Sequence, residues 1–359
     1  MRALIGLEMH QRLHARGWVP LLVIWLIALA GITGGAWLIA WATGQAEGEW
    51  LFSLLVYATL FLATVLVPAL AGGSVSEDRA SGVLALVQAS PVRPAAIIWA
   101  KAVAAWLASL VLVLTAAPFL VFAAWYGHVH WLIITVSLVA LLVELAFFAA
   151  VSVAFSGIVT RGATATALSY LLIGVLTVGT AIAYGAGSSM VTSTRSVQVN
   201  RYVAEQSTSA DQSGQADASD QADQSGTRCR MVTEERTYQR TDLVWPVLAA
   251  NPFVIVADAT PARFGRGGSG TAEGYPTNLL TAIKVDLRAA QHSPIPTDTV
   301  DECTWSTTAQ DTPEQRMAGT QPVWFWGMAG QAVLALLLLG WATHRVRTPY
   351  RRPSKERLD

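Results

Sequence analysis

The chain has 359 residues, of which 53% are hydrophobic and only 13% are charged. A soluble chain of this length would carry roughly a quarter charged residues and would divide into domains of about 100 to 200 residues. The composition therefore excludes a soluble organisation for most of the chain and argues against a nucleic-acid binder. Lysine plus arginine (24) balance aspartate plus glutamate (24), so only the regional sorting of these charges is informative.

Six long apolar stretches predict membrane-spanning helices. A span needs about 20 predominantly apolar residues to cross the hydrocarbon, and its backbone polar groups must be satisfied internally. The predicted spans are residues 18–42, 50–72, 96–125, 131–158, 165–184 and 323–343. Tryptophan and tyrosine residues lie near most span ends, as in an interfacial aromatic belt. We expect an all-α polytopic membrane protein with six transmembrane helices.

The basic residues outside residues 185–322 all fall on one side of this arrangement. They are Arg2, Arg12, Arg16, Arg79, Arg93, Lys101, Arg161, Arg345, Arg347, Arg351, Arg352, Lys355 and Arg357. Because cytoplasmic flanks keep positive charge, we expect a multi-pass protein of the plasma membrane with both termini cytoplasmic. Residues 344–359 then form a basic cytoplasmic tail, which either binds anionic lipid headgroups or serves only as a topology anchor.

Residues 185–322 form a large polar segment between the fifth and sixth spans, which we expect to be extracellular. Its portion 205–226 has no aromatic residue and no hydrophobic period, so disorder is predicted there. The two cysteines, Cys229 and Cys303, both lie in this segment. An oxidising exterior allows them to form a disulfide, and two unrelated reduced thiols are the alternative.

Residues 243–259, LVWPVLAANPFVIVADA, are apolar again but are shorter than a span and are interrupted by two prolines. A full crossing would move the basic tail outside, so a re-entrant or interfacial element is predicted. The core of a small external domain is the alternative. Residues 277–290 are expected to form a short amphipathic helix.

The most informative stretch outside the spans is residues 76–101, SEDRASGVLALVQASPVRPAAIIWAK, which begins in the predicted cytoplasmic loop 73–95. Negative charge favours the N-terminal end of a helix, so Glu77, Asp78 and Arg79 are expected to precede a short helix that begins near Ser81. Apolar residues follow on this helix and prolines end it; they are Leu84, Leu86, Val87, Pro91 and Pro94. Such a helix suits a lever moved by a partner, whereas an ordinary interfacial loop is the alternative.

This stretch resembles the permease subunits of ABC-2-type transporters. Their loop between spans two and three carries an E-x-R-x-x-G-x-L-x-x-L-x-x-x-P-like segment, followed by a lysine at the start of span three. The matching residues are Glu77, Arg79, Gly82, Leu84, Pro91 and Lys101, whereas Val83 stands where a threonine is frequent. The six spans and the large external segment resemble the same family, whose re-entrant helices would suit residues 243–259. The NPF at 251–253 looks like a stretch of its actinobacterial members.

The resemblance implies the membrane-spanning permease subunit of an ATP-driven exporter. Coupling to the ATPase would involve Glu77, Asp78, Arg79, Gly82, Leu84, Leu86 and Pro91. Such a subunit works with a separate cytoplasmic ABC ATPase and with a second permease subunit, either identical or different. The sequence contains no G-x-x-x-x-G-K-[ST] loop to cradle phosphates, so nucleotide is expected on the partner and no cofactor on this chain.

Glu144 is the one carboxylate near the middle of a predicted span, where an ionisable group is costly unless it is paired or faces water. It is predicted either to line the translocation path or bind a cation, or to be protonated and hydrogen-bonded to a neighbouring span. His128 and His130 have a chelating spacing without an adjacent carboxylate or thiol, so no metal site is expected. No hydrolytic motif occurs, and neither catalytic residues nor an enzyme is expected.

Two other functions stay open. A membrane sensor or receptor would bind its ligand with residues 185–322 and would need no ATPase. An ion-coupled secondary transporter would use Glu144 and would show inverted repeats with broken helices, and the two halves of the sequence show no such repeat. The sequence does not determine the cargo, the fold of residues 185–322 or the cavity-lining residues.

Overall fold

The computed structural model describes residue 6 and residues 18–43, 48–81, 94–204, 227–265, 274–296, 299–303 and 312–347. The described chain is mostly helical, and six of its helices are long and apolar enough to cross a membrane. All six coincide with the stretches expected from the sequence. The chain is therefore a multi-pass membrane protein.

The spans are continuous helices or runs of helices. They are α2 (Trp18–Thr43), α3 (Gly48–Ala71) with α4 (Ser74–Ala80), α6 (Pro94–Tyr126), α7 (Trp131–Ile158), α8 (Gly162–Gly174) with the π-helical η1 (Val175–Gly179) and α9 (Thr180–Met190), and α14 (Trp324–Arg347). Pro68 lies inside α3 and Pro118 inside α6. Both are tolerated because the freed backbone groups of a membrane helix find other partners.

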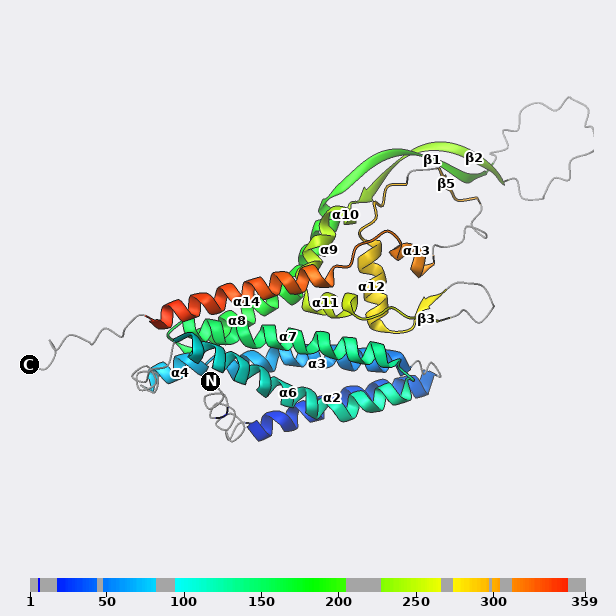
Figure 1. Cartoon of the computed structure of the whole chain (residues 1–359). Coiled ribbons are helices and arrows are strands. Elements are labelled where there is room, and N and C mark those ends of the chain that lie inside the picture. Colours follow the sequence, from blue (N-terminus) through cyan, green and yellow to red (C-terminus); the bar gives the residue numbers. More distant parts are fainter. Residues whose placement is uncertain are drawn as a thin grey trace, which may run out of the picture.

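The spans lie side by side in one bundle, with the start of α2, α4 and the end of α14 at the same end (Figure 1). The helix α7 is central and packs against α3, α6, α8 and α14. Its buried face includes the side chains of Phe148, Leu141 and Leu145. The helix α2 lies at the edge, where most of its apolar side chains are exposed, as expected of a surface that contacts lipid rather than protein.

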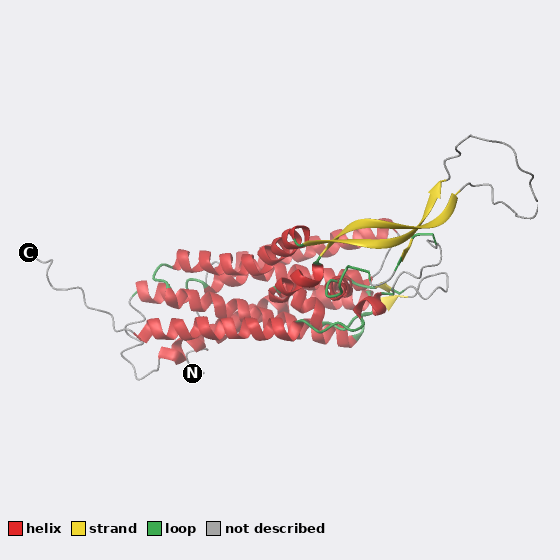
Figure 2. Cartoon of the chain, turned by 90° about the horizontal axis from the view of Figure 1, so that it is seen from above, coloured by secondary structure: helices red, strands yellow, loops and turns green. Residues whose placement is uncertain are grey.

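The segment between α9 and α14 folds at the opposite end of the bundle (Figure 1), and its long hairpin extends beyond the helices (Figure 2). The strands β1 (Thr192–Ala204) and β2 (Thr227–Gln239) pair antiparallel along their full length. The strand β5 (Val300–Asp301) pairs parallel with β1. The predicted disulfide between Cys229 and Cys303 is confirmed and ties β2 to the chain after β5.

This hairpin departs from the all-α expectation, which holds for the spans alone. Within residues 192–204 the five residues 196–200, SVQVN, alternate polar and apolar side chains, and threonines and valines recur on either side, a pattern typical of a half-buried strand. Hydropathy averaged over a span-sized window does not register a period of two. The alternation that indicates a strand is therefore present in the sequence, but average hydropathy does not detect it.

Short helices and a small hairpin complete the inserted segment. They are α10 (Thr241–Val244), the 3-10 helix η2 (Trp245–Ala250), α11 (Pro252–Ala259), β3 (Phe264–Gly265), β4 (Tyr275–Pro276), α12 (Leu279–Ala289) and α13 (Pro313–Met317). The stretch predicted to be re-entrant forms two helical halves bent by 98°, while its insertion into a membrane stays a prediction. The helix expected within residues 277–290 is confirmed as α12. Residues 205–226, where disorder was predicted, lie outside the described residues.

The inserted segment is attached to the first turns of α3. Glu49 accepts hydrogen bonds from Arg263 Nη1 at 2.7 Å, from Asn278 Nδ2 at 3.2 Å and from the Thr277 hydroxyl. One turn further, Ser53 Oγ accepts from the backbone N–H of Leu279 at 3.0 Å. The start of α12 is therefore fixed to the start of the second span.

Candidate functional site

The helix α4 carries the charged triplet Glu77, Asp78 and Arg79 at the end of the bundle opposite the inserted segment (Figure 1). The triplet lies inside α4, and Ser81 is the C-cap of this helix, so the three charges are themselves helical. The short helix expected to begin near Ser81 falls outside the described residues. Hydropathy placed the end of the second span near residue 72, whereas the helical run continues to Ala80. Four residues of the predicted coupling set lie outside the described residues; they are Gly82, Leu84, Leu86 and Pro91.

Two members of the triplet anchor α4 to neighbouring spans. Asp78 Oδ2 lies 2.7 Å from Nζ of Lys101 in α6, whose side chain is only 5% exposed. Arg79 Nη2 donates to the backbone carbonyl of Gly157 in α7 at 3.1 Å. A buried charge is strongly destabilising when its partner is removed, so the Asp78–Lys101 pair fixes where α4 lies.

Ser156 of α7 completes this attachment. Its Oγ accepts from the backbone N–H groups of Val75 at 2.8 Å and Ser76 at 3.1 Å. Both amides belong to the first turn of α4, where a helix has no internal acceptors for them. Glu77 is the exposed member of the triplet, so its carboxylate is the one that a partner protein can reach.

Glu144 lies on α7 in the interior of the bundle. Its side chain is fully buried, and neither carboxyl oxygen has a hydrogen-bond partner within the described ranges. Gln331 of α14 lies next to this carboxyl; its Nε2 donates to the Ala250 carbonyl at 3.5 Å, and its Oε1 is also unpartnered among the described residues. The structure thus brings together two buried polar side chains from different spans, while the transport role of Glu144 stays a prediction.

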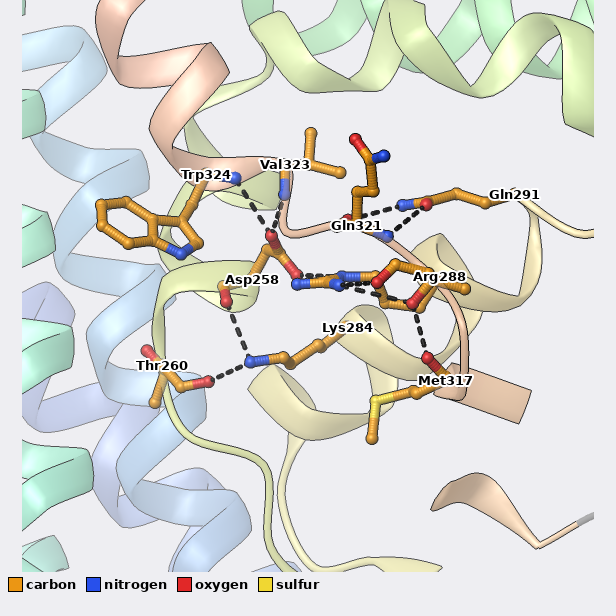
Figure 3. Close-up of polar contacts among 10 residues, drawn as sticks. Asp258, Thr260, Lys284, Arg288, Gln291, Met317, Gln321, Val323 and Trp324 are labelled. Carbon is orange, nitrogen blue, oxygen red and sulfur yellow. Dashed lines mark hydrogen bonds and ion pairs between the residues drawn. The ribbon is translucent and has the colours of Figure 1, made fainter. Parts of the chain in front are cut away.

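A buried carboxylate, Asp258 of α11, joins the inserted segment to the start of α14 (Figure 3). Its Oδ1 accepts from Arg288 Nε of α12 at 2.7 Å. Its Oδ2 accepts from the backbone N–H groups of Val323 at 2.6 Å and Trp324 at 3.0 Å. Negative charge is favourable at these amides because they form the N-terminal end of α14. The carboxylate therefore acts both as a helix cap and as one half of an ion pair.

Lys284 of α12 belongs to the same cluster and contacts the C-terminal end of α11 (Figure 3). Its Nζ donates to the backbone carbonyls of Asp258 at 2.9 Å and Thr260 at 3.0 Å, which lack partners at the end of α11. Burial lowers the pKa of Lys284, while the Asp258 carboxylate opposes this shift and the Arg288 guanidinium adds to it. The lysine therefore fixes the end of α11 despite an environment that disfavours its charge.

The NPF sequence attaches α11 to the fifth and second spans. Asn251 Nδ2 donates to the Thr177 carbonyl at 2.7 Å and to Thr180 Oγ1 at 2.9 Å. Thr177 lies in the π-helical η1, a kind of irregularity that is frequent at functional sites. Tyr57 of α3 donates its hydroxyl hydrogen to the Phe253 carbonyl at 3.0 Å. The bent helix pair is thus fixed at its bend by contacts with two spans.

Asp258 and Gln331 are site residues that were not predicted from the sequence. Asp258 is the only charged residue in the apolar run 243–259, and Gln331 is the only amide side chain in the predicted sixth span. A polar residue in an otherwise apolar stretch marks either a function or a buried partner. That signal would have found both residues, as it found Glu144.

Comparisons with protein-family models, curated proteins and solved structures found no match to this chain. Within the part of the chain that the structure describes, no group of three or more His, Cys, Asp or Glu side chains is placed to hold a metal ion. The functional assignment therefore rests on the residues and contacts described above.

Proposed function

We propose that the chain is the membrane-spanning permease subunit of an ATP-driven exporter of the ABC-2 type. It works with a separate cytoplasmic ATPase and with a second permease subunit. In this arrangement α4 and both termini are cytoplasmic, and the segment between α9 and α14 is extracellular. The six spans support the proposal, as does the placement of α4 and the inserted segment at opposite ends of the bundle.

The anchoring of α4 is the observation that carries the proposal. The Asp78–Lys101 pair and the contact of Arg79 with α7 attach a short charged helix to two spans. A force applied by an ATPase at the exposed Glu77 would therefore reach α6 and α7 without an intervening flexible loop. Transmission of this kind is what a coupling helix requires.

A pull-down of the tagged chain from detergent-solubilised native membranes tests the proposal, with co-purifying ATPases identified by mass spectrometry. Glu77→Arg reverses an exposed charge and leaves the Asp78–Lys101 pair intact, so we expect it to lose the ATPase that the wild type retains. Glu235→Arg reverses another exposed charge, on β2, and should retain the ATPase. Loss in both variants, or retention in both, argues against coupling through α4.

Absence of any ATPase from the wild-type sample, even after mild cross-linking, contradicts the exporter assignment itself. The sensor and the ion-coupled transporter would then be the better explanations. Equal amounts of chain in each sample, measured by quantitative blotting before the pull-down, exclude differences in expression as the cause of a loss.

A further inference from the structure

A groove on the side of the bundle lies next to Gln331, one of the two buried polar side chains described above. The groove encloses about 320 Å³ between α6, α7 and α14. Gln331 is the amide side chain among the residues that line the groove. The main apolar and aromatic lining residues are Trp99, Trp106, Val143, Phe147, Met328 and Leu336. Three of these, Trp99, Val143 and Leu336, are exposed, so the groove opens toward the outside of the bundle.

The polar part of this groove holds a buried hydrogen-bond acceptor without a donor. Gln331 is 5% exposed; its Nε2 donates to the Ala250 carbonyl at 3.5 Å, and its Oε1 has no partner within the described ranges. Glu144 does not line the groove but lies next to Gln331, and its two buried oxygens have no hydrogen-bond partner within the described ranges either. The indole N–H of Trp106 is already donated to the Leu142 carbonyl at 3.1 Å. Buried acceptors left unpaired are costly, so the chemistry complementary to this groove is a group rich in N–H donors.

We propose that this groove binds a hydrophobic amine. The apolar body would lie between α6, α7 and α14, with the ammonium directed toward Gln331 and Glu144. An ammonium carries three donors and offers the opposite charge that an ionised carboxylate inside the membrane requires. The rings of Trp99, Trp106 and Phe147 add faces that attract a cation.

A lipid acyl chain is the rival occupant, because the lining is largely apolar. It would fill the groove but would leave all three oxygens unpaired, and it would show no preference between a cation and a neutral molecule of the same shape. Amine binding is a property additional to the proposed export function, and it can be measured without an ATPase. Failure of amine binding would leave the pull-down result unaffected, and the reverse also holds.

The test is equilibrium dialysis of tritiated 4-phenylbutylamine against the full chain in lipid nanodiscs, with empty nanodiscs as background. The neutral analogue 4-phenylbutanol has nearly the same shape and lacks the charge. We expect the wild type to bind the amine about tenfold more tightly than the alcohol. Glu144→Gln keeps the shape of the side chain and removes its charge, so the amine should bind about tenfold more weakly while the affinity for the alcohol changes little.

Two further variants separate the groove from the bilayer. Val143→Trp fills the open side of the groove without touching the carboxyl and should weaken binding of both molecules. Glu235→Gln removes an exposed carboxylate on β2 and should change neither affinity. The wild-type preference requires no variant, so the test stands even if Glu144→Gln fails to fold.

Three results would overturn the proposal. Equal affinity of the wild type for amine and alcohol would identify the groove as a lipid site. A preference that survives in Glu144→Gln would show that the carboxyl does not recognise the cation. Amine binding that Val143→Trp leaves unchanged would place the amine in the bilayer or elsewhere on the chain.

Discussion

Replacing Asp258 with asparagine tests whether a charge holds the start of α14. The carboxylate accepts hydrogen bonds on both oxygens, from Arg288 on one and from the Val323 and Trp324 amides on the other. An asparagine side chain has one accepting oxygen, and its nitrogen can only donate. Either the guanidinium or the two helix amides would then face an N–H group instead of an acceptor.

The magnitude follows from burial. Asp258 is 1% exposed and Arg288 is 8% exposed, so the arginine would be left as a buried charge without its partner. Removing one member of a buried pair costs about 3–5 kcal/mol. At roughly 2 °C per kcal/mol, the lower end of the range for a domain of about 150 to 250 residues, the unfolding midpoint should fall by about 6–10 °C.

The assay is thermal unfolding of the purified chain in nanodiscs, followed by circular dichroism at one fixed scan rate. Asp286→Asn is the matched control, because Asp286 belongs to α12, the helix that carries Arg288, but its side chain is 76% exposed and its ion pair with Arg316 measures 3.4 Å. Exposed pairs contribute about 0–1 kcal/mol, so its midpoint should hardly change.

A double substitution, Asp258→Asn with Arg288→Met, removes the orphaned charge and should recover part of the loss. The reasoning is refuted if Asp258→Asn unfolds within about 2 °C of the wild type. It is also refuted if the double substitution lowers the midpoint by the sum of what Asp258→Asn and Arg288→Met each lower it alone, because residues that form a pair are expected to be coupled.

Three further predictions concern the same end of the molecule. Gly327→Ala should cost about 1–3 kcal/mol by overpacking, because a Cβ there would clash with the backbone carbonyl of Ala249 in η2. Gly330→Ala is the control, since a Cβ there would meet nothing within 4 Å; equal unfolding midpoints of the two variants would contradict the prediction. The Cys229–Cys303 disulfide links residues 74 apart, so reducing it should lower the free energy of unfolding of the inserted segment by about 4 kcal/mol. Limited proteolysis of the hairpin should then be faster in the presence of dithiothreitol, and an unchanged rate of cleavage would contradict this. Burial lowers the pKa of Lys284 in the folded chain below 10.5, its ordinary value. Between these two pKa values the unfolded chain binds more protons than the folded chain, so the free energy of unfolding rises with pH. The unfolding midpoint of the wild type should therefore rise relative to that of Lys284→Met as the pH is raised toward 10.5, and a constant difference between the two midpoints would contradict this.

The spans could be predicted from the sequence because hydrocarbon imposes one demand, a long apolar helix, that composition alone reveals. The end of the second span could not, because the charged residues Glu77, Asp78 and Arg79 break the apolar run on which hydropathy depends. In the structure Asp78 pairs with the buried Lys101 of α6, and the helical run reaches Ala80.

The candidate site shows the same division. Glu144 was identified from the sequence because a carboxylate in an apolar run is conspicuous wherever the helix points. Its neighbour Gln331 could not be assigned to it, since their contact depends on the rotation of α14 about its axis relative to α7. A helix that is apolar on all sides has no amphipathic period from which that rotation could be read.

The second span also connects the two ends of the molecule. Gly48–Ala80 is a helical run of 33 residues, or about 50 Å at 1.5 Å per residue. One end is attached through Glu49 to the inserted segment, and the other through Asp78 and Arg79 to the neighbouring spans. The contacts of α4 and those of the inserted segment are therefore made by the two ends of one span, interrupted only by the turn at Gly72 and Gly73. A displacement of α4 along the axis of this span would change the contacts of Glu49 at the start of α12.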